Sequence, residues 1–298
     1  MSLNKLAIIQ ARMSSSRLPG KVLMDIAGQP MLQHVLERTK RARMIDGLLI
    51  ATTTDPTDDV LEQFCQQHDV PCFRGSLPDV LDRFYQAGMH QHANVVIRLT
   101  ADCPLIDPAL IDLTISAFLG KSDSDFTQLS SLIPDYSSLI TRPFDFLANR
   151  LPPPWKRSLP IGLDVEVCTF DALEQAWKEA DQGYQREHVM PYLYDGVSFP
   201  PLDFPPGTEW YIERNSSAHG FKIGLLNHIP DCGTLRWTVD TPADLEFVRL
   251  VYHHFAGQDD FGWQDILSLL DREPGLASIN AQVSHKSAFD VDQRAHHS

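Results

Sequence analysis

The chain has 298 residues, of which 43% are hydrophobic and 21% charged, as expected of a soluble globular protein with a substantial core. Its 25 lysines and arginines against 39 aspartates and glutamates give a net charge of −14, which disfavours a general role in DNA or RNA binding. Five scattered cysteines without a Cys-x-x-Cys pair, and no signal pattern or membrane-length apolar run, lead us to expect a cytoplasmic protein without membrane insertion.

The first predicted element is a buried strand at 6–9, followed by a loop that carries the cations Arg12, Arg17 and Lys21 among small residues. Small residues let backbone N–H groups approach an anion, and the cations can neutralise and hydrogen-bond phosphate oxygens. The spacing matches neither a P-loop nor a dinucleotide-binding glycine motif. The residues alone leave two interpretations equal, a polyphosphate cradle or a solvated basic loop.

The next stretch alternates between helices and strands. We expect strands at 47–52, 71–74 and 94–100, and helices at 31–39, 56–68, 80–85 and 108–118. Asp55-Pro56 and Asp107-Pro108 predict helix starts, because aspartate caps a helix and proline fits its first turn. Val60 is placed on the inner face of the second helix. The pattern predicts an α/β fold with a mostly parallel sheet, helices on both faces, and ligands outside the carboxyl ends of the strands.

The organisation changes after about residue 130, and we interpret 131–233 as an inserted arm or subdomain on the main sheet. It contains a predicted strand at 163–167, helices at 170–180 and 186–195, and proline-rich loops at 152–154 and 200–206. A strand at 235–240 follows, then a helix that begins at Thr241-Pro242, with Asp244 completing a box at its N-terminus and Leu250 in its apolar stripe. A last helix at 263–270 precedes a polar tail.

Two aspartates follow predicted strands at the same edge of the sheet as the cationic loop. Asp102 comes after the strand at 94–100, and Asp240 ends the strand at 235–240. Either one alone is more often a helix cap or a turn residue. Together, two carboxylates at one edge can hold Mg²⁺, which prefers oxygen ligands and bridges phosphates.

Residues 9–23, Ile-Gln-Ala-Arg-Met-Ser-Ser-Ser-Arg-Leu-Pro-Gly-Lys-Val-Leu, resemble the signature loop of the cytidylyltransferases that activate acidic sugars, most of all the spore-coat polysaccharide biosynthesis protein F-like branch. The synthetases of CMP-sialic acid and CMP-3-deoxy-manno-octulosonate are more distant relatives. Further segments resemble the family in its own order: 50–54, 73–76, 79–83, 100–107, 162–167, 186–189 and 235–242. The resemblance implies a Rossmann-like nucleotide-diphospho-sugar transferase fold, with a nucleotidyltransferase domain at 1–255, an acceptor and dimerisation subdomain at 131–233, and a C-terminal helix and flexible tail at 256–298.

The resemblance also implies site residues. Arg12 and Lys21 would bind the β- and γ-phosphates and stabilise departing pyrophosphate, while Asp102 and Asp240 would hold Mg²⁺. The remaining nucleotide-binding residues would be Gln10, Ala11, Arg17, Thr52, Thr53, Arg74 and Thr100. The acceptor-binding residues would be Asp164, Glu166, Arg186, Glu187, His188 and Arg236. No side chain is assigned as a general base.

The implied reaction is CMP transfer from CTP to an acidic sugar, such as a 3-deoxy-ulosonic or sialic-like acid, for surface polysaccharide biosynthesis by a homodimer. Two alternatives stay open: a sugar-phosphate nucleotidyltransferase that uses another nucleoside triphosphate, and a non-catalytic nucleotide-sensing protein on the same fold. An oxidoreductase is disfavoured, because the first strand is not followed by the glycine fingerprint.

Overall fold

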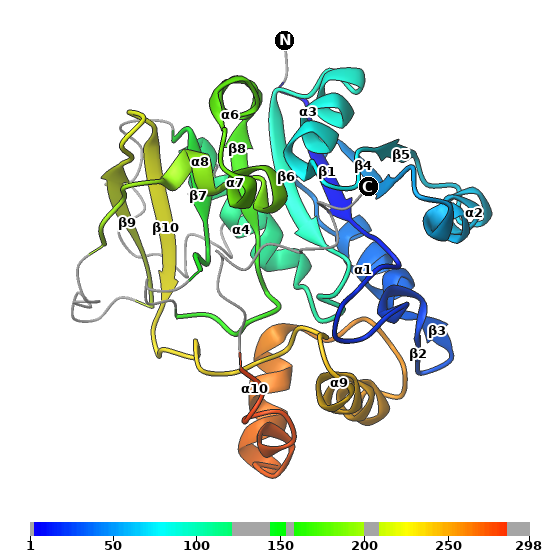
Figure 1. The fold of residues 1–298 in the computed structure, drawn as a ribbon. Coiled ribbons are helices and arrows are strands. Elements are labelled where there is room, and N and C mark those ends of the chain that lie inside the picture. The colour runs from blue at the N-terminus through cyan, green and yellow to red at the C-terminus, as the bar shows by residue number, and fades with distance from the viewer. Residues whose placement is uncertain (1–2, 121–143, 153–157, 200–208, 285–298) are drawn as a thin grey trace.

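The computed structural model describes residues 3–120, 144–152, 158–199 and 209–284. Its framework is an eight-stranded sheet in the order β5-β4-β1-β6-β8-β7-β10-β9 (Figure 1). These strands are β1 (Lys5–Gln10), β4 (Gly47–Thr53), β5 (Cys72–Gly75), β6 (Val95–Thr100), β7 (Phe146–Ala148), β8 (Glu166–Thr169), β9 (Trp210–Ser216) and β10 (Lys222–His228). A separate two-stranded ribbon joins β2 (Asp25–Ile26) to β3 (Gln29–Pro30).

The first half of the sheet is parallel and the second half is mixed. Strands β5, β4, β1 and β6 run parallel, as does the pair β7 and β10. Strand β8 runs antiparallel to β6 and β7, and β9 runs antiparallel to β10. The predicted arm at 131–233 therefore supplies β7, β8, β9 and β10 to the main sheet. Its role in acceptor binding and dimerisation stays a prediction.

Helices cover both faces of the sheet, as the sequence predicted. One face packs against α1 (Met31–Lys40), α2 (Asp59–Gln67) and α4 (Pro108–Leu119), and the same core extends to α9 (Pro242–His254) and α10 (Trp263–Arg272), which lie beyond the ends of the strands in Figure 1. The other face packs against α3 (Val80–His90), α6 (Phe170–Glu179) and α8 (Pro191–Tyr194). The short helices are η1 (Lys21–Leu23), η2 (Pro56–Asp58), α7 (Gly183–His188) and η4 (Leu276–Ser278).

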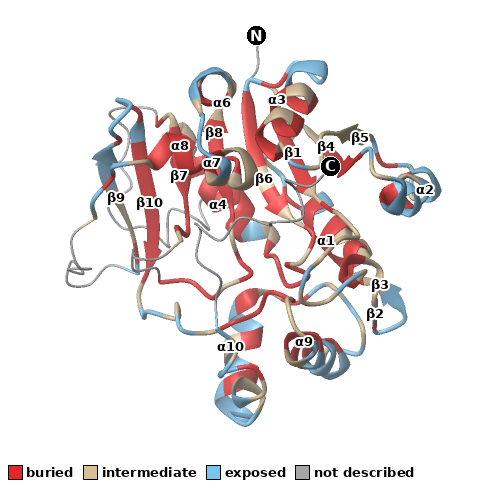
Figure 2. Ribbon diagram, in the orientation of Figure 1, coloured by how far each residue is buried: buried red, intermediate tan, exposed pale blue. Residues whose placement is uncertain are grey.

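Strand β1 shows why the central strands are apolar throughout. Ala7 and Ile9 enter one core, and Leu6 and Ile8 enter the other. A strand covered on both faces must be apolar at successive positions, whereas a strand with one wet face alternates. Figure 2 shows the central strands buried along most of their length and the outer sides of α2, α9 and α10 exposed.

The predicted helix starts are confirmed. Asp55 caps η2 through the Thr57 amide, and Asp107 caps α4 through two amides, each with proline in the first turn. Thr241 caps α9, and Asp244 returns a bond to the Thr241 amide as in a capping box. These short-range signals need no tertiary context, which is why sequence alone finds them.

Two apolar residues predicted on inner helix faces are exposed. Val60 is 40% and Leu250 is 37% accessible to solvent. In each case the neighbours one position away, Leu61 in α2 and Val251 in α9, are fully buried. The apolar pattern was therefore wider than the stripe of each helix that the core covers.

The predicted strand at 163–167 begins later, because β8 starts at Glu166. Asn149 takes the place of a strand partner: its side chain donates to the Leu163 carbonyl at 2.6 Å and accepts from the Val165 amide at 2.8 Å. Just before, Gly162 has φ +107°, and a Cβ there would lie 2.5 Å from the Thr238 nitrogen. Gly162 is thus required for a close crossing of two backbones, not for a strand.

The predicted strand at 235–240 is wrong apart from one bridge between Ile161 and Arg236. Its apolar alternation is real, since Trp237 and Val239 are both buried. However, its amides bond to two different segments, Trp237 to the Ile161 carbonyl and Val239 to the Asp102 carbonyl. A segment whose amides bond to two separate partners satisfies its backbone hydrogen-bonding groups without joining the sheet.

The predicted helical stretch at 186–195 is confirmed in part, because the structure has two short helices, α7 and α8, in place of one continuous helix. Val189 separates them with φ 71°, and Pro191 opens α8. The predicted proline-rich loop at 200–206, most of that at 152–154 and the tail beyond 284 lie outside the described residues.

Candidate active site

The cationic loop lies at the carboxyl end of β1, directly beside the end of β6. In the sheet register Gln10 of β1 pairs with Thr100 of β6, so the segments that follow both strands emerge at one edge. A cavity of about 250 Å³ opens there. It is lined by Gln10, Arg12, Ser14, Ser15, Ser16, Arg17, Lys21, Val22, Arg98, Thr100, Ala101, Asp102, Glu187, His188 and Asp240.

Lys21 stands at the centre of the polar contacts. Its ammonium nitrogen lies 2.8 Å from Asp102 Oδ2, 2.8 Å from Asp240 Oδ1 and 2.7 Å from the Val239 carbonyl oxygen. Burial by itself would lower the pKa of Lys21, but the two carboxylates outweigh it and the pKa is raised. The three contacts satisfy all three protons of the ammonium, so Lys21 is held as a cation between the two aspartates.

Asp240 is the most heavily paired carboxylate of the site. Its Oδ2 lies 2.7 Å from a guanidinium nitrogen of Arg17 and 2.7 Å from one of Arg236, while its Oδ1 faces Lys21. Burial by itself would raise the pKa of Asp240, but the three cations outweigh it and hold the pKa well below its usual range.

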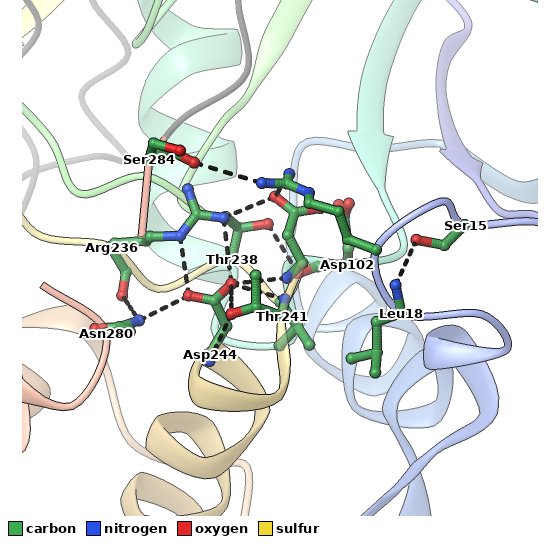
Figure 3. Close-up of polar contacts among 12 residues, drawn as sticks. Ser15, Leu18, Asp102, Arg236, Thr238, Thr241, Asp244, Asn280 and Ser284 are labelled. Atoms are coloured by element: carbon green, nitrogen blue, oxygen red, sulfur yellow. Dashed lines mark hydrogen bonds and ion pairs between the residues drawn. The ribbon is translucent and has the colours of Figure 1, made fainter. Parts of the chain in front are cut away.

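Arg236 is fixed in turn by Asp244, which is fully buried. Arg236 Nε donates to Asp244 Oδ1 at 2.9 Å, and Arg236 Nη2 reaches Asp244 Oδ2 at 3.2 Å (Figure 3). Arg236 is therefore a supporting residue behind Asp240. Its side chain is only 4% exposed, so it does not line the cavity as an acceptor-binding arginine would.

Four of the predicted nucleotide-binding residues do not line the cavity. Ala11, Thr52 and Thr53 are buried beside it. Arg74, at the end of β5, donates to Asp59 at 2.7 Å and to Glu62 at 2.9 Å. These contacts tie β5 to α2, a structural role that the sequence could not separate from a binding role.

The predicted acceptor-binding residues divide into two groups. Glu187 and His188, at the end of α7, line the cavity. Arg186 points away from it, because its Nε binds the Asp79 carboxylate at 3.0 Å and anchors α7 to the start of α3. Asp164 and Glu166 are not among the residues that line the cavity, and each is paired with an arginine that sequence reasoning did not select.

Those two arginines are Arg98 and Arg150. Arg98, within β6, binds Glu166 and the Gln10 side chain, and it lines the cavity. Arg150, which is 5% exposed, lies 3.1 Å from Asp164. The signal for Arg98 was present, since a single arginine interrupts the apolar run of a buried strand.

A cytidylyltransferase family model matches residues 6–204. The chain belongs to this cytidylyltransferase family. The match covers β1, the cationic loop, Asp102 and the chain through α8, so the enzyme class is a nucleotidyltransferase.

Whole-length relatives agree with the family. The chain is 30% identical to the spore coat polysaccharide biosynthesis protein SpsF of Bacillus subtilis over 92% of its own length and 96% of that protein. It is 35% identical to the 3-deoxy-manno-octulosonate cytidylyltransferase of Trichlorobacter lovleyi over 80% of its own length and 94% of that protein. A solved cytidylyltransferase from Leptospira borgpetersenii superposes with a TM-score of 0.74 at 26% identity, over 95% of this chain and all of that one.

The two aspartates of this cytidylyltransferase suit a magnesium ion. Their oxygens already converge on one cation, the Lys21 ammonium. The Asp102 side chain keeps 27% of its surface exposed, so the site opens to the cavity, where water and phosphate oxygens can complete a shell. Mg²⁺ is usually held by one or two carboxylates together with substrate phosphates, which fits this donor set. Among the described residues, no group of three or more metal-ligating side chains occurs.

No helix within the described ranges has the length and apolar character needed to cross a membrane.

Proposed function

We propose that the chain transfers CMP from CTP to an acidic sugar, with release of pyrophosphate and with Mg²⁺ as cofactor, for the biosynthesis of a surface polysaccharide. The relative named for 3-deoxy-manno-octulosonate supports an acidic acceptor, and the relative named for spore coat polysaccharide supports a role in surface polysaccharide biosynthesis. We further propose that the enzyme works in the cytoplasm as a homodimer, as the sequence led us to expect.

One observation carries the proposal: a lysine from the first loop joins two aspartates from distant segments inside a polar cavity. Lys21 and Asp240 are 219 positions apart in the chain, yet their charged atoms lie 2.8 Å from each other. A cluster of cations and carboxylates at the carboxyl edge of the parallel strands suits a metal–triphosphate ligand.

The cations of the loop divide the work on the triphosphate. Arg12 and Lys21 line the cavity and would bind the β- and γ-phosphate oxygens, which stabilises the negative charge that grows on departing pyrophosphate. Arg17 would hold the loop in place through its ion pair with Asp240. Asp102 and Asp240 would hold Mg²⁺, which when bound would neutralise phosphate charge.

The acceptor hydroxyl would attack the α-phosphorus in line with the leaving pyrophosphate. On the acceptor side the cavity offers Glu187, His188 and the Arg98–Glu166 pair. Arg98 is the arginine we assign to the acceptor carboxylate, because neither Arg186 nor Arg236 lines the cavity. Catalysis would come mainly from positioning and charge stabilisation.

The decisive experiment measures pyrophosphate release with each of the four ribonucleoside triphosphates and Mg²⁺. The acceptor panel should contain 3-deoxy-ulosonic acids, sialic acids and neutral sugar 1-phosphates. Turnover confined to CTP and acidic sugars supports the proposal.

Two other outcomes would refute it in different ways. Robust turnover of a sugar 1-phosphate would assign the enzyme to the sugar-phosphate nucleotidyltransferases. Nucleotide binding without turnover of any pair would indicate a sensor on the same fold.

A further inference from the structure

A short C-terminal segment crosses the back of the candidate active site. We call residues 276–284 the C-terminal strap. Its beginning is fixed by apolar contacts, since Leu276, Ala277 and Ile279 pack against the larger core. Asn280 follows and is 3% exposed, although the next residue along the strap, Ala281, is exposed. The strap is therefore buried deeply at one polar side chain.

The Asn280 amide group makes two hydrogen bonds to the support of Asp240. Its Nδ2 donates to the Arg236 carbonyl oxygen at 2.9 Å and to Asp244 Oδ1 at 3.0 Å. Figure 3 shows Asn280 and Arg236 both directed toward Asp244. The Asn280 side chain thus contacts the main chain of Arg236, and it also contacts the Asp244 carboxylate that orients the Arg236 side chain.

Asp244 relays this contact to Asp240. Besides the bonds from Arg236 and Asn280, Asp244 Oδ2 accepts from the Asp240 amide at 3.0 Å and from the Thr241 amide at 2.9 Å. Displacing a fully buried carboxylate with this many donors is costly, because each lost donor leaves its buried charge less satisfied. Asp240 is consequently held both by its own backbone and by the Arg236 side chain.

The end of the strap contacts the cationic loop directly. The Ser284 carbonyl oxygen accepts from Arg17 Nη1 at 3.4 Å, while Arg17 Nη2 binds Asp240 Oδ2 at 2.7 Å. Arg17 and Arg236 share that one oxygen of Asp240. The strap therefore contacts both of the arginines that bind this Asp240 oxygen.

The space beside the strap makes these polar contacts important. A cavity of about 450 Å³ lies between the strap residues Ala277, Ala281 and Val283 and the segment that contains Trp237. The side of the strap that faces this cavity lacks packing partners there, so the hydrogen bonds of Asn280 and Ser284 add to the apolar contacts at its beginning in fixing its position.

We propose that the C-terminal strap is a positioning element of the active site and that Asn280 is its positioning residue. Asn280 sets the orientation of Arg236, and through Arg236 and Asp244 it sets the position of Asp240. The consequence for catalysis rests on the proposed function, but the mechanical link between strap and site does not.

The test compares Asn280→Leu with Asn227→Leu in the full chain. Both asparagines are buried, and Asn227 bonds to Glu213 and a backbone carbonyl in the sheet, away from the cavity. Each variant removes a buried amide of similar size, so both should lower thermal stability. Hydrogen exchange by mass spectrometry is read on peptides covering 12–23 and 236–244, without substrate. Steady-state kinetics with CTP and the acidic acceptor are measured alongside.

For Asn280→Leu we expect faster exchange in both peptides, and a kcat lower by about 10- to 100-fold with unchanged acceptor KM, because a small displacement of a positioned group costs this much. Asn227→Leu should change neither the exchange of these two peptides nor kcat. If Asn280→Leu does not fold, Asn280→Ala removes the same donors with less bulk.

Unchanged exchange at 12–23 and 236–244 in a folded Asn280 variant would overturn the proposal, whatever the kinetics. Equal effects of the two variants would also overturn it, since they would reveal a general loss of stability. Faster exchange in the Asn280 variant, together with no turnover by the wild-type protein, would refute the proposed function and still support the link between the strap and the site.

Discussion

Replacing Lys21 by methionine removes the cation between the two aspartates and keeps a side chain of similar length. In the structure this deletes three contacts of 2.7–2.8 Å and leaves Asp102 and Asp240 facing each other. Removing one partner of a buried ion pair costs about 3–5 kcal/mol, and the partial exposure of Asp102 argues for the lower end, about 3 kcal/mol. At about 2–4 °C per kcal/mol, the midpoint of thermal unfolding in EDTA should fall by about 6–12 °C.

Magnesium should reverse much of that loss in the variant. A ligand at 100 times its Kd stabilises a protein by about 2.7 kcal/mol, nearly the amount lost. In the wild-type protein Mg²⁺ must first displace the Lys21 ammonium. The midpoint of thermal unfolding of the wild type should therefore rise less than that of the variant. Activity should stay low in both conditions, because the cation that we assign to the leaving pyrophosphate is gone.

The assay is differential scanning calorimetry of both proteins in EDTA and in excess Mg²⁺. Lys40→Met is the matched control, because the Lys40–Glu37 pair is 41% exposed on both sides and such pairs contribute little. The reasoning fails if Lys21→Met unfolds at the wild-type temperature in EDTA. It fails equally if Mg²⁺ stabilises the wild type as much as the variant.

Three further predictions follow from single contacts. Asp102→Ala and Asp240→Ala should each lower kcat by orders of magnitude while circular dichroism shows a folded protein. Arg186→Met should lower the unfolding midpoint and leave the acceptor KM unchanged, because Arg186 binds Asp79 and not the cavity. Asp259→Asn should destabilise the protein near neutral pH and much less in acid. Burial alone would raise the pKa of Asp259, but hydrogen bonds from buried neighbours lower it below its ordinary 3.8. Its contribution is therefore complete above pH 3.8 and lost as the pH falls through the lowered value, which urea unfolding at several pH values can measure.

Each of these has a result that would contradict it. Near-normal Mg²⁺-dependent turnover by either aspartate variant would remove that residue from the metal site. A raised acceptor KM in Arg186→Met, with unchanged stability, would restore Arg186 to the acceptor site. A stability difference for Asp259→Asn that stays constant with pH would show that lost packing and not charge causes it.

The sequence predicted those features of the fold that local signals determine. Strand β1 could be found because burial on both faces requires an unbroken apolar run, and helix α9 because Thr241 and Asp244 complete a capping box within one turn. The segment at 235–240 could not be placed, because its apolar alternation imitates a strand while its amides bond to two remote segments. Whether such a segment joins a sheet depends on distant partners that a local pattern does not contain.

The same limit applies to the site. The cluster of Arg12, Lys21 and Asp102 was predictable, since strand ends meet at one edge. The uses of individual arginines were not, because an arginine that binds substrate and one that binds a structural carboxylate look alike in sequence. In the structure Arg186 and Arg74 bind the carboxylates of Asp79 and Asp59, so their predicted binding roles stay predictions, and Arg98 lines the cavity although it was not selected.

The bridge from Lys21 to Asp240 also has a consequence for biosynthesis of the protein itself. The four parallel strands β5, β4, β1 and β6 are complete within the first 100 residues, so this part of the sheet can form while the chain is still being made. The cluster of Lys21, Asp102 and Asp240 cannot form at that stage, because Asp240 is made much later. The contact of Arg17 with Ser284 is made later still. We expect newly made or refolding chains to gain secondary structure well before they gain activity, with the recovery of turnover tracking the docking of the described segment from Arg236 to Ser284.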